Sequence, residues 1–496
     1  MNSEKYRPTF AVGESVTLTP ERVAHGGALV ARYEGRVFFV RHALLGETVR
    51  SRITGTGPKQ RFYFADVIEV LESSPKRRQH PWAPADALAT YAENRAPLGG
   101  MEFGHIEPAT QRDYKKAVVA EQLVRLGGMN ADNALLESLT VHELSAQDLS
   151  QRTRVHFGVD SSGHIAMYPY QSDSARAVEN FPLAASEIAE LHLEKLDLSD
   201  FSRVDAAVSS TGQRFVQFTV RSPQTPGQVE NQLADQLEKL WGDLDQEVCA
   251  KITAERIAGR RRGERALDVN WGSPRLIERF TLEGTTFTFA VDGSGFWQNH
   301  RLAPQILAAT VRDFADFKAG ESVLDLYSGA GLFTAVAADA VGADGYVLAV
   351  EGSPVTSANA EDNFVAGGVS RTVASKKTQI VPVRGDVAKV LGEISKKSQN
   401  TKSSGRSQNV KPQYRRAASP DVVVLDPSRE GAGKQVCELI SSLNPRAVVY
   451  VACDPAALGR DTGYMRELGW RIDRLESFDL YPNTHHVETV ARFVRF

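Results

Sequence analysis

Apolar and polar positions alternate in different ways along this chain. After about residue 271, short apolar runs typical of buried strands alternate with spacers of helical periodicity. These runs occupy residues 322–326, 345–350, 379–384, 421–425 and 446–452. The pattern predicts a Rossmann-like, doubly wound parallel sheet over residues 271–496. The last two runs, 472–479 and 487–495, have no long helix between them, so we expect a closing hairpin at the sheet edge.

The N-terminal part has short runs of alternating apolar and polar residues, separated by glycine-bearing turns. They lie at residues 15–18, 28–33, 36–40, 48–53 and 62–70. Five such strands predict a small OB-like β-barrel over residues 8–72. Residues 24–53 resemble a TRAM domain, which is an RNA-binding module. A barrel that serves only to dock other parts of the protein is the alternative.

The region between these parts, residues 73–270, mixes both kinds of pattern. A turn-rich linker leads into a helical stretch at 107–126. Beyond it lie amphipathic strands at 154–159 and 214–220 and helical stretches near 184–196 and 228–242. We therefore expect a linker followed by a central α+β domain that binds RNA, and a multidomain α/β protein as a whole.

Two basic segments interrupt these patterns. Residues 256–265 carry five arginines that either contact phosphates or form a solvated turn. Residues 395–419 have almost no aliphatic side chains and are rich in Ser, Lys, Arg, Gln and Asn. Such a segment is predicted to be a disordered basic insertion, and a tolerated insertion is favoured over an RNA contact.

Composition narrows the class of protein. With 496 residues and a formal charge of −3, the chain is not basic throughout, so any contact with nucleic acid must come from local patches. The N-terminus does not resemble a signal peptide, and no apolar run approaches the ~20 residues of a membrane helix. We expect a cytoplasmic protein without membrane association. The three cysteines, Cys249, Cys437 and Cys453, are far apart and support neither disulfides nor a metal cage.

Cys453 is the candidate nucleophile. It follows an apolar run that reads as a strand and precedes Asp454 and Pro455, which are typical of a helix start. Ligands of α/β sheets bind at this edge, and a helix N-terminus stabilises a thiolate, so we expect its pKa to lie below the usual value. A small buried thiol at the end of a strand is the alternative.

A candidate cofactor pocket follows the first strand of the same sheet. Gly329 and Gly331 form a turn that a nucleoside-bearing ligand approaches closely, and Glu351 ends the next strand, where an acid grips ribose hydroxyls. Position 334 is Thr instead of the third glycine of dinucleotide-binding proteins. This departure favours S-adenosylmethionine over a nicotinamide dinucleotide.

Two further acids follow strands at the same edge. Asp386 comes after the third strand and Asp426 after the fourth. Both suit the adenine amine or the cationic end of S-adenosylmethionine, although acids at such positions also cap helices.

Five segments together resemble the RNA 5-methyluridine methyltransferase family, across essentially the whole chain. They are residues 296–300 (FWQNH), 325–333 (DLYSGAGLF), 426–431 (DPSREG), 452–461 (ACDPAALGRD) and 481–488 (YPNTHHVE). The resemblance implies a class I methyltransferase sheet in which Gln298, Tyr327, Glu351 and Asp426 contact S-adenosylmethionine. It also implies that Cys453 is the nucleophile and Glu488 the base.

The chemistry of uridine methylation supports these two roles independently. Uracil C5 is a poor nucleophile, so a thiolate must first add to C6 and push electron density onto C5. The C5 proton must then leave before the thiol is expelled, and Glu488 is a suitable carboxylate for that step. Arg429 and Arg460 either orient the adduct or form structural ion pairs.

The chain departs from the family pattern at several positions. Some members bind an iron–sulfur cluster through four cysteines, but residues 80–105 contain no cysteine here and Met101 follows the Gly-Gly pair, so we expect neither a cluster nor another metal. Ser428, Asp454 and Leu332 replace residues that are common in the family. These changes leave the nucleophile and the base in place.

The favoured function is therefore methylation of uridine C5 in structured RNA. The TRAM-like part favours 23S ribosomal RNA over transfer RNA, and we expect a monomer that does not bind DNA. The alternative that is not an enzyme is a noncatalytic RNA-binding protein that retains the cofactor pocket. Methylation of an exocyclic amine would require an Asp/Asn-Pro-Pro-aromatic platform that stacks the base, and residues 426–429 (DPSR) do not supply one.

Overall fold

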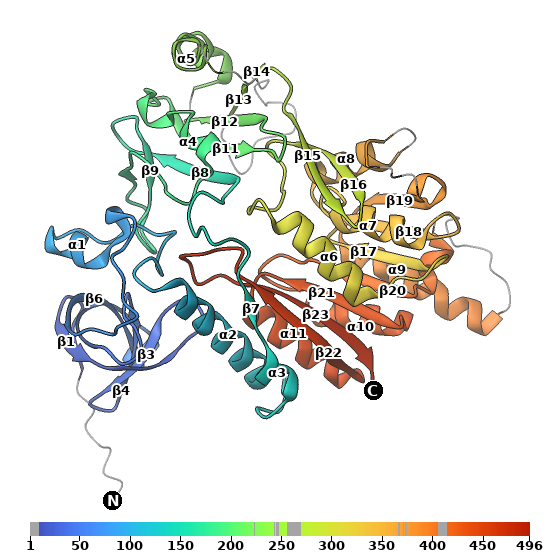
Figure 1. The fold of residues 1–496 in the computed structure, drawn as a ribbon, viewed down its shortest axis with the longest axis horizontal. Helices are drawn as coiled ribbons and strands as arrows, with labels where there is room; N and C mark the ends of the chain where they lie inside the picture. Colours follow the sequence, from blue (N-terminus) through green and yellow to red (C-terminus); the bar gives the residue numbers. More distant parts are fainter. Residues whose placement is uncertain are drawn as a thin grey trace, which may run out of the picture.

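A computed structural model describes residues 9–222, 224–242, 244, 248–254, 269–365, 368–370, 372, 374–404 and 414–496. Figure 1 shows three lobes: a blue N-terminal sheet, a green central sheet and a yellow-to-red C-terminal sheet. The basic run at 256–265 lies outside the described residues.

The N-terminal lobe is a strongly curled sheet of six strands in the order β1-β5-β6-β4-β3-β2. Its strands are β1 (Ser15–Leu18), β2 (Pro20–Val23), β3 (Leu29–Tyr33), β4 (Arg36–Arg41), β5 (Thr48–Thr56) and β6 (Phe62–Glu72). A short 3₁₀ turn, η1 (Pro58–Gln60), precedes β6. The prediction of five strands missed β2, which begins with proline and exposes both of its middle residues. In the described part of this lobe, β1 and β2 remain the two edges of an open sheet.

The segment that follows the N-terminal sheet contacts that sheet at its start and the C-terminal lobe further along. Its elements are η2 (Ala83–Ala85), α1 (Ala87–Ala92), α2 (Pro108–Arg125), α3 (Ala134–Ser138) and β7 (Val141–His142). Helix α2 confirms the predicted helix at 107–126 and packs on α11 (Pro455–Glu467). A Cβ at Gly459 of α11 would lie 2.5 Å from the carbonyl oxygen of Gln122, so the close approach of the two helices requires glycine.

The central lobe is a sheet of seven strands in the order β10-β9-β8-β11-β12-β13-β14. Its strands are β8 (Arg154–Val159), β9 (Ile165–Met167), β10 (Arg176–Ala177), β11 (Phe201–Val208), β12 (Arg214–Val220), β13 (Val248–Ala254) and β14 (Val269–Trp271). Helix α5 (Pro226–Trp241) covers it and begins with a capping box formed by Thr225 and Gln228. The predicted helical stretch near 184–196 holds only α4 (Ser186–Ala189) and the turn η3 (Leu193–Lys195).

The C-terminal lobe is a mixed sheet of eight strands in the order β19-β18-β17-β20-β21-β23-β22-β7. Its strands are β17 (Ser322–Leu326), β18 (Tyr346–Glu351), β19 (Gln379–Arg384), β20 (Val422–Leu425), β21 (Ala447–Ala452), β22 (Trp470–Phe478) and β23 (Glu488–Arg495). The first five are parallel, as predicted, and β22 and β23 form the predicted antiparallel hairpin. The sequence did not predict β7, which pairs with β22 and forms the outer edge.

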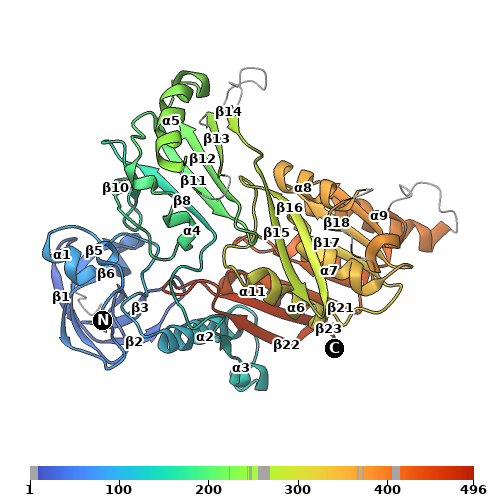
Figure 2. The same ribbon diagram turned by 45° about the horizontal axis from the view of Figure 1, so that its top comes forward.

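Helices cover both faces of this sheet because its strands are apolar on both sides. On one face lie α6 (Ala303–Ala315), α7 (Leu332–Val341) and α8 (Pro354–Phe364), and on the other lie α2, α9 (Val387–Ser404), α10 (Gly433–Leu443) and α11. The ribbon β15 (Arg275–Leu282) and β16 (Thr285–Asp292) connects the lobe to the central sheet (Figure 2).

The basic segment 395–419 differs from its prediction. Helix α9 extends to Ser404, so the first part of the segment is helical instead of disordered. After a stretch outside the described residues comes the 3₁₀ turn η6 (Arg416–Ala418), and Tyr414 and Ala417 are buried against the sheet. Lysine, glutamine and serine have moderate helix propensities, so this composition does not prevent a helix whose first turns pack on the core.

None of the helices in the described part of the chain is both long enough and apolar enough to cross a membrane.

Candidate active site

The three lobes meet around one cavity of about 790 Å³. Its wall includes Gly27 and Arg41 from the N-terminal lobe, Tyr168 from the central lobe, and many residues from the carboxyl edge of the C-terminal sheet. The predicted site residues that line it are Gln298, Tyr327, Gly329, Glu351, Asp426, Cys453 and Glu488. The fold thus gathers side chains separated by up to 190 positions in the sequence around one space.

Two predicted site residues, Gly331 and Asp386, lie outside the cavity wall. Gly331 starts helix α7 at φ 99°, and a Cβ there would lie 2.1 Å from the ring of Phe364. Asp386 accepts a hydrogen bond of 2.9 Å from the backbone N–H of Lys389 and so caps helix α9. The contacts of Asp386 are thus those of a residue that caps a helix, which was the alternative to cofactor binding.

The carboxylate of Glu351 is fixed at the end of β18 by the backbone. It accepts hydrogen bonds from the N–H of Gly329 at 2.8 Å and from the N–H of Ser353 at 2.6 Å. Tyr327, which ends β17, has a φ of 60°, a conformation that costs a residue with a side chain about 1 kcal/mol or more. The backbone at this edge thus holds the Glu351 carboxylate in place and adopts an uncommon conformation at Tyr327, beside the cavity.

Asp426 lies beside a second buried carboxyl group, Asp325. Burial, and next the charge of Asp325, raise the pKa of Asp426 to about 7, while a hydrogen bond from Gln298 lowers it. Burial also raises the pKa of Asp325 to about 7, although Thr334 donates a hydrogen bond of 2.5 Å to it. The cavity therefore has a carboxyl group that changes its charge near neutral pH.

Cys453 and Glu488 lie at adjoining ends of neighbouring strands. The antiparallel pairing of β21 and β23 ends at Ala452 and Thr489, so Cys453 directly follows β21 and Glu488 is the first residue of β23. The charge of Glu488 acts on the thiol of Cys453. Both the candidate nucleophile and the candidate base line the cavity.

The electrostatics of this pair differ from expectation. Burial, and next the carboxylates of Glu488 and Asp426, raise the pKa of Cys453 to about 12, so the prediction of a lowered pKa is wrong for the ligand-free protein. Burial and the charge of Asp426 also raise the pKa of Glu488 well above its ordinary value. For Cys453, the effect of burial and of these carboxylates exceeds that of Arg429, whose charge lowers the pKa.

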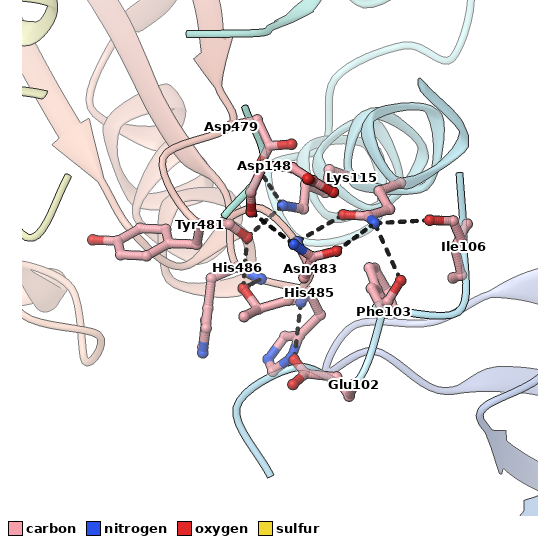
Figure 3. Close-up of polar contacts among 12 residues, drawn as sticks. Glu102, Phe103, Ile106, Lys115, Asp148, Asp479, Tyr481, Asn483, His485 and His486 are labelled. Carbon is pink, nitrogen blue, oxygen red and sulfur yellow. Dashed lines mark hydrogen bonds and ion pairs between the residues drawn. The ribbon is translucent and has the colours of Figure 1, made fainter. Parts of the chain in front are cut away.

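The loop that leads into Glu488 is anchored by helix α2 (Figure 3). The buried ammonium of Lys115 donates 2.5 Å to Asp479 and 2.9 Å to the carbonyl of Tyr481. The N–H of Asn483 donates 2.8 Å to the side chain of Gln111, whose amide donates back to the Asn483 side chain at 3.2 Å. These contacts fix the start of β23, and through it Glu488.

Two contacts that the sequence did not predict connect the N-terminal half to the catalytic edge. His25 of the N-terminal lobe hydrogen bonds with Asp454 at 2.8 Å, and this contact raises the pKa of His25. Glu102 accepts a hydrogen bond of 2.9 Å from the N–H of His485 and also pairs with its ring (Figure 3). Although burial opposes it, His485 lowers the pKa of Glu102 to about 2. No sequence signal joined residues more than 380 positions apart.

The two arginines whose roles were open have different environments. Arg429 is exposed, lines the cavity and contacts His486 at 3.5 Å. Arg460 instead pairs with Asp461 and donates to the carbonyl of Glu430, outside the cavity wall. Arg460 therefore forms a structural ion pair, whereas Arg429 is positioned to contact a ligand in the cavity.

The described residues contain no cluster of three or more His, Cys, Asp or Glu side chains arranged to hold a metal ion.

The chain matches known RNA methyltransferases over most of its length. A family model described as tRNA (Uracil-5-)-methyltransferase matches residues 134–495. An uncharacterised RNA methyltransferase of Streptomyces avermitilis is 33% identical over 97% of this chain and 98% of that protein. One of Streptomyces coelicolor is 32% identical over 98% of this chain and 93% of that protein.

The fold is similar to that of a solved enzyme. The tRNA (uracil-54, C5)-methyltransferase of Pyrococcus abyssi, in complex with S-adenosyl-L-homocysteine, covers 97% of this chain and 100% of its own, with a TM-score of 0.62 and 16% identity. The lobes and the edge cavity thus define a methyltransferase fold. The chain belongs to the tRNA (uracil-5-)-methyltransferase family.

Proposed function

We propose that this protein transfers a methyl group from S-adenosylmethionine to C5 of a uridine in structured RNA. The proposal is carried by one observation: Cys453, at the end of β21, and Glu488, at the start of the paired strand β23, line one cavity together with Glu351 and Asp426. Mapping 5-methyluridine in ribosomal and transfer RNA from cells with and without the protein tests it. Loss of one modification in the deleted strain is expected, whereas unchanged 5-methyluridine in both RNAs would reject the proposal.

Two residues perform the covalent steps. The sulfur of Cys453 adds to C6 of the uracil, and the electron pair displaced from the C5–C6 bond makes C5 the nucleophile. S-adenosylmethionine supplies the methyl group at C5. Glu488 then removes the C5 proton, the C5–C6 double bond re-forms, and the Cys453–C6 bond breaks. Every atom except the transferred methyl group and the lost proton returns to its starting position.

Because the pKa of Cys453 is raised, the first step of this reaction requires that the thiol be deprotonated when the substrates bind. At neutral pH the ligand-free protein holds a thiol, which is a poor nucleophile. A positive charge placed beside Cys453, Glu488 and Asp426 favours the anionic forms of all three groups. We infer that the thiolate forms only when the cationic methyl donor occupies the cavity, which protects the cysteine between reactions.

The methyl donor fits the part of the cavity that the C-terminal lobe forms. There Glu351 accepts hydrogen bonds from the ribose hydroxyls, while Gln298 and Asp426 face the cationic end of the donor. Thr356 also lines the cavity, and its buried hydroxyl has no hydrogen-bond partner among the described residues. An unpartnered buried hydroxyl is costly, so a polar ligand at this position has a donor and acceptor to use.

We assign the RNA contacts to the N-terminal and central lobes. We propose a TRAM-type RNA-binding module for residues 8–72 and an RNA-binding role for 73–270, with methyl transfer in 271–496. Ribosomal RNA, 23S in particular, is favoured because of the N-terminal module. Transfer RNA is the second candidate, since the Pyrococcus abyssi neighbour acts on tRNA. We further propose that the protein acts as a monomer, because RNA itself covers the cavity.

Replacing Glu351 with alanine is expected to weaken binding of S-adenosylmethionine by about 10- to 150-fold, because a charged group that bonds the ribose contributes roughly 1.5–3 kcal/mol. Isothermal titration calorimetry measures the change. Asp386→Ala is the matched control, because it removes a carboxylate from the same sheet edge but outside the cavity. It is expected to lower stability by about 1 kcal/mol and to leave the affinity unchanged. Equal losses of affinity in both variants would contradict the assignment.

Binding of S-adenosylmethionine is expected to tighten by up to about tenfold between pH 6 and pH 8. The pKa of Asp426 is about 7, so the group is mostly neutral at the lower pH and mostly anionic at the higher, where it attracts the sulfonium cation. Asp426→Asn is expected to flatten this dependence. A variant that retains the full pH dependence would show that another group, such as Asp325, is responsible.

A further inference from the structure

The side of the cavity formed by the central and N-terminal lobes carries two exposed aromatic side chains. Tyr168 and Tyr170 follow strand β9 and line the cavity, with 42% and 53% of their surfaces exposed. A single exposed aromatic residue on a protein surface is ordinary. Here two exposed aromatic side chains lie on one wall of a cavity, and separate contacts hold each of them in place. Packing of the protein core does not explain this arrangement.

Tyr170 is held by an arginine of the neighbouring lobe. The guanidinium carbon of Arg41 lies 4.1 Å from the centre of the Tyr170 ring. Arg41 in turn donates two hydrogen bonds, of 2.8 and 2.7 Å, to the buried carboxylate of Asp66, which also accepts 2.6 Å from Tyr91. Because this carboxylate fixes the guanidinium, the ring of Tyr170 rests on a rigid cationic support and keeps an exposed surface.

Tyr168 is positioned by two glycines. A Cβ at Gly158 of β8 would lie 2.3 Å from the Tyr168 hydroxyl, so the ring in this position packs over a residue without a side chain. The N–H of Gly99 donates 3.0 Å to the Tyr168 carbonyl. Three residues after Gly99, Glu102 binds His485, so one short segment joins this wall to the catalytic edge.

We propose that Tyr168, Tyr170 and Arg41, here called the tyrosine wall, bind unpaired bases of the RNA strand next to the target uridine by stacking. The inference rests on the proposed function and adds to it the conformation of the substrate. Aromatic rings and arginine planes in a groove are the common means of holding single-stranded RNA, since every base has a π-face.

The charges around the wall agree with a nucleic-acid strand. Arg152 and Arg429 line the same cavity as Arg41, and such cationic side chains suit RNA phosphates. The carboxylate of Glu102, which also lines the cavity, pairs with His485. The enzyme therefore takes its uridine from a loop or an opened helix, because stacked, paired flanking bases would not reach the wall.

The test is a comparison of steady-state kinetics with RNA from cells that lack the protein. Tyr168→Ala and Tyr170→Ala are each expected to raise KM for RNA about 5- to 150-fold, with kcat at saturating RNA and KM for S-adenosylmethionine nearly unchanged. Tyr170→Phe keeps the ring and should behave as the wild type. Phe496→Ala, which removes an exposed aromatic ring outside the cavity, is the matched control.

A binding measurement separates the two hypotheses. The wild type is expected to bind a fluorescent single-stranded oligoribonucleotide more tightly than its duplex, and the alanine variants are expected to lose this preference. If the wild type methylates RNA but both alanine variants keep its KM and its preference for single strands, the tyrosine wall is rejected and the proposed function stands. If the wild type methylates no RNA, the proposed function fails, and an unchanged preference in the variants rejects the wall as well.

Discussion

Cys453→Ala is expected to abolish methylation of RNA, with a loss of turnover on the order of 10⁴-fold or more, because among the described residues of the cavity wall Cys453 supplies the thiol that adds to C6. The assay is transfer of a labelled methyl group from S-adenosylmethionine to RNA that lacks the modification. Binding of S-adenosylmethionine should persist, since Cys453 directly follows β21 and forms no disulfide.

Cys249→Ala is the control for this variant. Cys249 is buried in β13 of the central sheet and does not line the cavity, so its removal is expected to leave turnover close to that of the wild type. Residual turnover above about one hundredth of the wild-type rate in Cys453→Ala, with the protein free of wild-type contamination, would contradict nucleophilic catalysis by this residue.

Glu488→Gln is expected to lower turnover by about 10²- to 10⁴-fold, because the C5 proton loses its acceptor. Unlike the cysteine variant, it should still form the bond between Cys453 and C6 and still transfer the methyl group once. A covalent complex of protein and methylated RNA is then expected to accumulate, and denaturing gel electrophoresis detects it as a band of reduced mobility.

Glu476→Gln provides the matched control for this second prediction. Glu476 lies on the neighbouring strand β22, is half-buried beside His142 and is not among the residues that line the cavity. It should leave the rate unchanged and accumulate no complex. A Glu488→Gln variant that is slow but never accumulates the complex would place the role of Glu488 before methyl transfer, for example in binding or in activating the thiol.

The sequence predicted the strands of the C-terminal sheet well because both of its faces are buried. Residues 446–452 are almost all apolar, and β21 (Ala447–Ala452) is completely buried. Strands whose pairing is set by the rest of the fold were missed. β7 has only two residues, and β2 consists of Pro-Glu-Arg-Val. Neither pattern distinguishes a strand from a loop.

Cys453, Glu351 and Asp426 were recognised because each lies at the end of an apolar run, whereas Glu488 was suggested by the resemblance to the family. The pairing of β21 with β23 brings the end of the first strand, before Cys453, next to the start of the second, where Glu488 lies. Sequence alone could not separate Glu351, whose carboxylate lines the cavity, from Asp386, whose carboxylate caps a helix. Both follow parallel strands, and only the direction of the side chain distinguishes them.

The pKa shifts and the contacts between lobes could not be predicted from the sequence, and the reason is the same for both. The raised pKa of Cys453 follows from burial and from two carboxylates on other strands. The pairs His25–Asp454 and Glu102–His485 join segments separated by hundreds of residues. Such effects depend on distances in space, which no local pattern encodes.

The central claim is that one sulfur atom bonds to a pyrimidine ring beside the methyl donor. The most direct measurement is mass spectrometry of the protein after incubation with S-adenosylmethionine and RNA containing 5-fluorouridine, whose fluorine cannot be removed as a proton. We predict a peptide containing Cys453 that carries a methylated fluorouridine nucleotide. Attachment at a different residue, or unmodified Cys453 in a preparation that methylates ordinary RNA, would contradict the account.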